Sequence, residues 1–161
     1  MQKRLELFFG VLIFTAFIVW IAAFSGGSAD TNKNLKIFFL DVGQGDSEYI
    51  KLSSGEDILI DGGPDDKVLQ ELGKVMTFGD RRIDLVVLTH PHADHLTGLV
   101  DVISRYEIGE VWESGVDYPS NIYDAWKAEI KNKNIPDKFV KAGDEKDFNN
   151  STIKFKVLYP L

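Results

Sequence analysis

The most prominent pattern in the chain is a change, near residue 25, from one continuous apolar run to short periodic segments. Residues 7–24 carry no charge, and Lys3 and Arg4 precede them. As a helix, these 18 residues would extend about 27 Å, close to the hydrocarbon thickness of a bilayer, about 30 Å. The run has no polar face, which argues against a helix buried on one side in a soluble core. We therefore predict a transmembrane helix within residues 1–24.

Basic residues ahead of such a segment favour retention of the N-terminus in the cytoplasm. We therefore expect a single-pass membrane protein whose folded part lies outside the cytoplasm. The alternative is a signal peptide cleaved at the small residues 27–29, followed by secretion. Residues 25–34 are polar and small, which is typical of a flexible linker.

The folded part begins at residue 35 with alternating and apolar segments that are typical of strands. We predict strands over residues 35–41, 47–52 and 57–61, separated by turns rich in glycine. A helix is expected over residues 65–76 because its apolar side chains repeat with helical spacing.

The pattern then alternates between strand and helix. Residues 85–88 form an apolar run of the kind that a sheet covered on both faces buries. A helix is expected next, with Leu96, Leu99 and Ile103 on one face, then a strand near residues 110–113. Ser120 is expected to cap a further helix, and residues 152–159 alternate as a final strand. Together, these strands and helices predict an α/β layered domain over residues 35–161. We expect Trp112, Trp126 and Tyr118 in its core or at an interface, and lining a pocket is the alternative.

Charge and composition narrow the possible partners. The chain has 18 basic and 25 acidic side chains and a formal net charge of −7. Without residues 1–24, the remainder has 16 basic and 24 acidic side chains and a net charge of −8. Such a surface repels nucleic acid unless bound metal or a local patch overrides it. The absence of cysteine excludes disulfides and thiolate metal sites.

All three histidines of the protein fall within residues 90–95, whose sequence is His-Pro-His-Ala-Asp-His. Imidazole and carboxylate ligands at this spacing suit zinc and related divalent ions. The segment joins a predicted buried strand to a helix, and sites in α/β sheets usually form at that edge. His90, His92, Asp94 and His95 are therefore the candidate metal ligands.

The spacing His90-x-His92-x-Asp94-His95 resembles the signature of metallo-β-lactamase-fold hydrolases. That resemblance implies an αββα sandwich and two divalent ions, zinc or else manganese. It assigns His90 and His92 to one ion and Asp94 and His95 to the second, and it gives Asp94 the further role of orienting the attacking water. Asp61, at a strand end before two glycines, matches the upstream aspartate that supports the metal loop.

Residues 41–47, Asp-Val-Gly-Gln-Gly-Asp-Ser, resemble the opening of the hydrolase domain of ComEC-type competence proteins. Asp41 and Asp46 are therefore near-site candidates, although a hairpin turn alone would also explain the glycines. The resemblance favours a phosphodiester substrate, which includes extracellular DNA during uptake. Lactams, lactones and thioesters are the alternative substrates on this fold.

The resemblance also implies ligands that this sequence does not contain. The ComEC-type strings T-G-D and G-H-H-G are absent, and no histidine follows His95. We therefore expect residues 35–161 to be the front half of the sandwich, from a truncated frame. The alternative is a domain that has lost catalysis.

Overall fold

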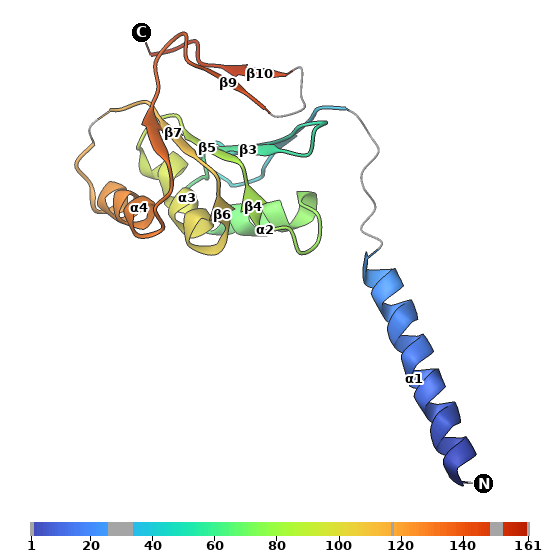
Figure 1. Cartoon of the computed structure of the whole chain (residues 1–161). Helices are drawn as coiled ribbons and strands as arrows, with labels where there is room; N and C mark the ends of the chain where they lie inside the picture. Colours follow the sequence, from blue (N-terminus) through green and yellow to red (C-terminus); the bar gives the residue numbers. More distant parts are fainter. Residues whose placement is uncertain (1, 26–33, 117, 149–152, 161) are drawn as a thin grey trace. The chain divides into compact units, whose positions relative to one another are not determined.

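The computed structural model describes residues 2–25, 34–116, 118–148 and 153–160 (Figure 1). The chain divides into two compact units, residues 1–33 and 34–161. The described residues of the first unit form the helix α1 (Gln2–Ser25). The predicted linker over residues 25–34 and the alternative cleavage site at residues 27–29 lie almost entirely outside the described residues.

The predicted transmembrane anchor is not supported. A membrane-spanning helix requires about 20 consecutive, predominantly apolar residues. Within the described part of the chain, no helix combines the length and the apolar character needed to cross a bilayer. The expectation of a single-pass membrane protein is therefore wrong.

The second unit is built on a six-stranded mixed sheet. Its strands are β1 (Lys36–Phe39), β2 (Glu48–Lys51), β3 (Asp57–Ile60), β5 (Leu85–Leu88), β7 (Val111–Glu113) and β8 (Asp137–Phe139), in the order β1-β2-β3-β5-β7-β8. β1, β2 and β3 pair antiparallel, whereas β3, β5, β7 and β8 pair parallel. The parallel strands share one carboxyl edge, and the loop after β5 begins there.

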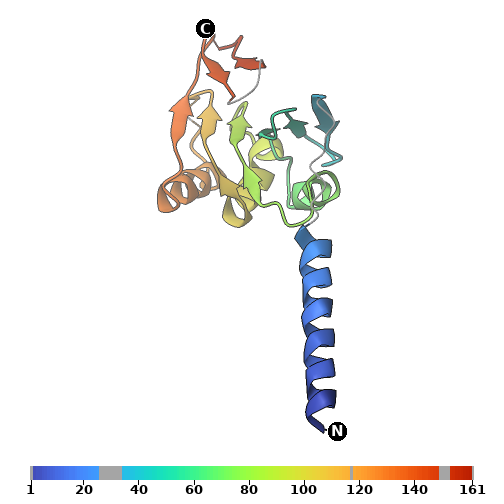
Figure 2. The ribbon, with the colours of Figure 1, turned by 45° about the vertical axis from the view of Figure 1, so that its right-hand side comes forward.

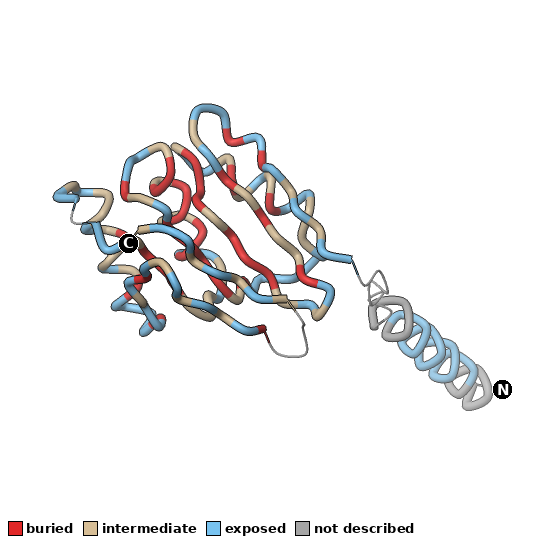
Figure 3. Tube along the Cα trace, turned by 90° about the horizontal axis from the view of Figure 1, so that it is seen from above, coloured by how far each residue is buried: buried red, intermediate tan, exposed pale blue. Residues whose placement is uncertain are grey.

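Three helices cover one face of this sheet: α2 (Lys67–Val75), α3 (Ala93–Arg105) and α4 (Asn121–Asn132) (Figures 1 and 2). Each buries the apolar side predicted from its spacing, for example Leu72 on α2, Leu99 on α3 and Trp126 on α4. Figure 3 shows the buried residues running through the central strands. The hydroxyl of Ser120 accepts a hydrogen bond from the Tyr123 amide at 3.2 Å, so the predicted cap is confirmed.

The opposite face of the sheet is covered in part by a hairpin of β9 (Glu145–Asp147) and β10 (Lys154–Lys156) (Figure 1). A second apolar cluster, which includes Trp112 and Phe148, lies between this hairpin and the sheet. A two-stranded sheet of β4 (Arg82–Ile83) and β6 (Glu107–Ile108) lies beside the main one. The predicted α/β architecture is confirmed, with helices on one face and a strand hairpin on the other.

Candidate metal centre

The three histidines converge at the carboxyl edge of the sheet, between β5 and α3. The ring centroids of His90 and His92 are 4.6 Å apart, and those of His90 and His95 are 4.0 Å apart. Potential ligand atoms of His90, His95 and Asp61 all lie within 4.8 Å of one another. The histidine cluster predicted from the sequence is thus brought together in space.

Asp61 supports this cluster through hydrogen bonds. It follows β3, and its carboxylate accepts hydrogen bonds from the Thr89 amide at 2.9 Å and the Thr89 hydroxyl at 2.5 Å. The second oxygen also contacts Nδ1 of His95 at 2.8 Å. Burial raises the pKa of Asp61, and these hydrogen bonds oppose that rise. Because its oxygens already accept these bonds, Asp61 is suited to orient His95 and is poorly placed to act as a metal ligand itself.

These hydrogen bonds also fix which ring nitrogens are available. With Nδ1 of His95 facing a carboxylate, its proton lies there and the Nε2 lone pair is free. The single hydroxyl hydrogen of Thr89 goes to Asp61, so the contact of 3.0 Å between Thr89 Oγ1 and His90 is a bond donated by Nδ1. Both His90 and His95 therefore present Nε2 as a free nitrogen.

The electrostatics favour the form of histidine that binds metal. Burial lowers the pKa of His90, and the nearby rings of His95 and His92 lower it further. A lowered pKa keeps the imidazole neutral at physiological pH, and only the neutral ring can ligate a cation. Oδ2 of Asp94 lies 4.0 Å from Nε2 of His95, slightly more than the separation of about 3.4 Å between two ligands on one tetrahedral ion. This donor set fits a divalent metal ion.

Asp41 and Asp46 do not join the histidines in the same way. The Asp41 carboxylate is exposed and pairs with Lys67 of α2 at 3.1 Å, which lowers its pKa. Asp46 is exposed, and its charge acts on the neighbouring Glu48. The loop between them nevertheless contacts the centre, because a Cβ on Gly45 would lie 2.0 Å from the carbonyl oxygen of Asp94. Only glycine fits at that approach, and its φ of 127° also favours glycine.

Three residues of the centre were not identified from the sequence. Thr89 links Asp61 to His90, as described above. The Tyr118 ring meets the His92 ring edge to face, with centroids 5.3 Å apart, so the predicted assignment of Tyr118 to core or interface needs this correction. Glu48 is half-buried on β2, and its carboxylate interacts electrostatically with Asp61 and His95.

Tyr118 and Glu48 come from elements far from the histidines in sequence, so no local pattern indicated them. The only available signals were an acidic residue where β2 begins and a tyrosine in the loop before α4. Trp112 and Trp126 are buried in the core.

The fold and this centre define an α/β protein with a candidate histidine–aspartate metal site. Residues 40–157, more than half of the chain, match the family model of the Metallo-beta-lactamase superfamily. The protein therefore belongs to this superfamily, whose fold implies binding of divalent metal ions.

Solved structures of similar fold are much longer than this chain. An Rm3 metallo-beta-lactamase is 15% identical in sequence, with a TM-score of 0.47, and the match covers 71% of this chain and 45% of the lactamase chain. A diphosphatase from the PhnP family is 21% identical with a TM-score of 0.44, covering 69% and 41%. A long form RNase Z from yeast is 20% identical with a TM-score of 0.43, covering 70% and 18%. The chain thus spans less than half the length of these proteins, and no curated protein gives a significant match.

Proposed function

We propose that this protein is a metal-dependent hydrolase of phosphodiesters. The observation that carries the proposal is the convergence of the three histidine rings at the carboxyl edge of the sheet, with the ring of His90 4.6 Å from that of His92 and 4.0 Å from that of His95. His90 and His92 are assigned to one ion, and Asp94 and His95 to a second. Zinc is the expected metal, because neutral imidazole and carboxylate are its usual ligands without cysteine, and manganese is the alternative.

Divalent ions bound there would supply a water of lowered pKa and stabilise negative charge on the reacting oxygens. The protein's own residues have the remaining tasks. Asp61 keeps the His95 ring in one tautomer and orientation. Asp94, whose side chain is 41% exposed, can accept a hydrogen bond from the attacking water and so orient it.

The choice of a phosphodiester rests on residues 41–47, which resemble the ComEC-type opening. That loop packs directly on the metal loop through Gly45 and Asp94. Its position against the centre supports a part in forming the site beyond that of a hairpin turn. Single-stranded DNA is a second phosphodiester to be tested, although the net charge of −7 disfavours it.

The test is hydrolysis of bis-p-nitrophenyl phosphate by the full chain with Zn²⁺ or Mn²⁺. Asp94→Ala should lower turnover at least 100-fold, because it removes both a ligand and the group that orients water. Asp101→Ala, on the same helix two turns away, is the matched control and should retain turnover. Nitrocefin and a thioester are assayed in parallel. Hydrolysis of either without cleavage of the phosphodiester would refute the assignment of the substrate.

A further inference from the structure

A groove of about 370 Å³ lies between α2, the end of α3 and the loop that joins α2 to β4. The parallel pairing of β4 with β6 places Arg82 opposite Glu107, and the Glu107 amide donates a hydrogen bond of 2.7 Å to the Arg81 carbonyl. Arg81 therefore lines the same groove as Arg105 and Tyr106, at the end of α3. The volume lies within the range of about 300–1,000 Å³ that is usual for small-molecule sites.

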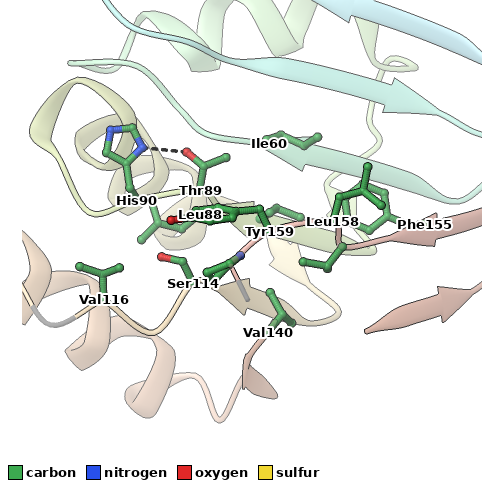
Figure 4. Close-up of a pocket in the computed structure, with 13 residues that line it drawn as sticks. Ile60, Leu88, Thr89, His90, Ser114, Val116, Val140, Phe155, Leu158 and Tyr159 are labelled. Atoms are coloured by element: carbon green, nitrogen blue, oxygen red, sulfur yellow. Dashed lines mark hydrogen bonds between the residues drawn. The ribbon is translucent and has the colours of Figure 1, made fainter. Parts of the chain in front are cut away.

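The groove is on the helix side of the sheet, away from the metal centre. Its loop leads into β4 and the start of β5, whereas His90 and Thr89, hydrogen-bonded to each other in Figure 4, follow the end of β5. The hollow drawn in Figure 4 lies on the sheet face that an αββα sandwich covers with its second sheet, so its apolar side chains face the core. Helices form the outer layers of such a sandwich, and the groove therefore faces solvent.

Arginine side chains make the groove positive. Its charged lining residues are Arg81, Arg105 and Asp80, which leave one net positive charge in a chain whose net charge is −7. The Asp80 carboxylate already accepts a hydrogen bond of 3.2 Å from the Arg82 amide. Among the residues that the structure describes, no carboxylate pairs with either arginine of the lining. The helix dipole alone would favour Arg105 in the last turn of α3, but Arg81 belongs to no helix. Two arginines without a partner suit an anion that accepts paired hydrogen bonds, as a carboxylate does.

Apolar side chains form the rest of the lining. Leu69 and Met76 are half-buried, and Phe78, in the loop after α2, is fully exposed. Burial raises the pKa of Tyr106, and the charges of both arginines oppose the rise, while the aspartate adds to it. The charged and apolar parts of the lining are thus next to each other. A ligand with an apolar body would remove Phe78 from water and gain affinity by doing so.

We infer that this groove binds a small aromatic or alkyl carboxylate, with its carboxylate at Arg81 and Arg105 and its apolar body against Met76 and Phe78. A phosphate monoester carries about 1.5 to 2 negative charges at neutral pH, which is more than the lining can neutralise. Binding in the groove requires no metal ion, so it is independent of the proposed hydrolysis.

Calorimetric titration of the metal-free full chain compares 1-naphthaleneacetate with 1-naphthaleneacetamide, which has the same ring system and no charge. The carboxylate should bind about tenfold more tightly, because it alone can form ion pairs with the two arginines. Raising the salt concentration from about 50 mM to about 500 mM should weaken binding of the carboxylate and leave binding of the amide unchanged. Equal affinities of the two compounds, or no binding of the carboxylate, would overturn the inference.

Substitutions in the same titration locate the binding site. Arg81→Gln and Arg105→Gln should each weaken binding of the carboxylate about fivefold. Arg82→Gln is the matched control and should keep the affinity, because the Arg82 guanidinium pairs with Asp84 at 2.9 Å and lies outside the lining. Phe78 is fully exposed, so Phe78→Ser should not disturb folding, yet it should weaken binding of both compounds about threefold by removing part of the apolar wall. Undiminished binding in both Arg81→Gln and Arg105→Gln, or an equal loss in Arg82→Gln, would place the anion elsewhere and overturn the inference.

Discussion

Asp61 and His95 are joined by a buried contact of 2.8 Å between the carboxylate and Nδ1 of the imidazole. Asp61 adopts a positive φ of 53°, a conformation that few residues other than glycine, asparagine and aspartate accept readily. The strand end, the backbone turn and the hydrogen bond together fix the orientation of the His95 ring, whose Nε2 lies 4.0 Å from Oδ2 of Asp94.

Asp61→Asn should weaken zinc affinity by about 10- to 100-fold, the usual effect of removing a carboxylate that orients a ligating histidine. Asparagine tolerates the positive φ, so the backbone should be retained. Titration calorimetry with Zn²⁺ measures the change, and Asp101→Asn serves as control. Undiminished affinity in Asp61→Asn would show that the carboxylate does not support the metal centre.

Gly98 of α3 and Gly62 after β3 bring the helix against the loop that carries Asp61. A Cβ on Gly98 would lie 2.0 Å from the carbonyl oxygen of Gly62. Gly98→Ala should therefore destabilise the fold by about 1–3 kcal/mol, as overpacking does. Gly73→Ala is the matched control, since it also lies in a helix and nothing is within 4 Å of its Cβ position. It should stabilise by about 0.5–1 kcal/mol. Urea unfolding of both variants tests the prediction, and equal stabilities would contradict it.

The fold could be predicted where the local pattern alone determines the element. The helical spacing of Leu96, Leu99 and Ile103 and the cap at Ser120 are local signals, and α3 and α4 formed there. β8 and β9 have the sequences DKF and EKD, which show no apolar strand pattern. They form because a neighbouring strand pairs with them, which is a tertiary effect. For the same reason the sequence did not reveal β4 and β6.

The metal centre was predictable to the extent that its residues are adjacent in the chain. The ligand spacing lies within residues 90–95, and Asp61 was assigned from its match to the upstream aspartate of the family resemblance. The hydrogen bonds through Thr89 and the contact of Tyr118 with His92 depend on how separate elements pack. The membrane anchor was predicted from hydropathy alone, and that reasoning failed.

Asp57 should give the protein a stability that depends on pH. Burial raises its pKa to about 6, despite a hydrogen bond of 2.5 Å from the Tyr49 hydroxyl. An acid whose pKa is higher in the folded state favours folding while it is protonated. The raised pKa of Asp57 therefore stabilises the folded state by roughly 3 kcal/mol below pH about 4. Most of that stabilisation is lost as the pH rises to 6.

The pKa of Asp57 can be followed through the ¹³C shift of its carboxyl carbon. Tyr49→Phe removes the hydrogen bond that lowers this pKa, so the titration should move upward. The variant should also lose about 1–3 kcal/mol of stability at pH 8, because a buried carboxylate oxygen is left unpaired. A titration midpoint near 4 in the unmodified protein would contradict the prediction.

Tyr118 should hold the ring of His92, which caps α3 without a side-chain hydrogen bond and is exposed. Tyr118→Ala should weaken zinc binding about threefold to tenfold, because His92 would gain rotamer freedom that binding must then remove. Tyr118→Phe keeps the ring contact and should restore most of the affinity. The measurement is competition with a chromophoric chelator. Equal loss in both variants would mean that the hydroxyl group, and not the ring contact, is responsible.

Glu48 should act on the metal centre through its charge. It pairs directly with Ile60 in the β2–β3 register, one residue before Asp61. Burial raises its pKa, the charges of Asp61 and Asp46 raise it further, and His95 opposes them. A bound cation would stabilise the ionised form of Glu48, so metal binding should release its proton and become tighter as the pH rises through its pKa.

Glu48→Gln should reduce zinc affinity by up to tenfold at pH 8 and less at pH 5. Glu129→Gln, which changes a half-buried acid on α4 far from the histidines in sequence, should not alter affinity at either pH. Titration calorimetry at both pH values measures these affinities. If Glu48→Gln lost the same zinc affinity at both pH values, a role of Glu48 through its charge would be contradicted.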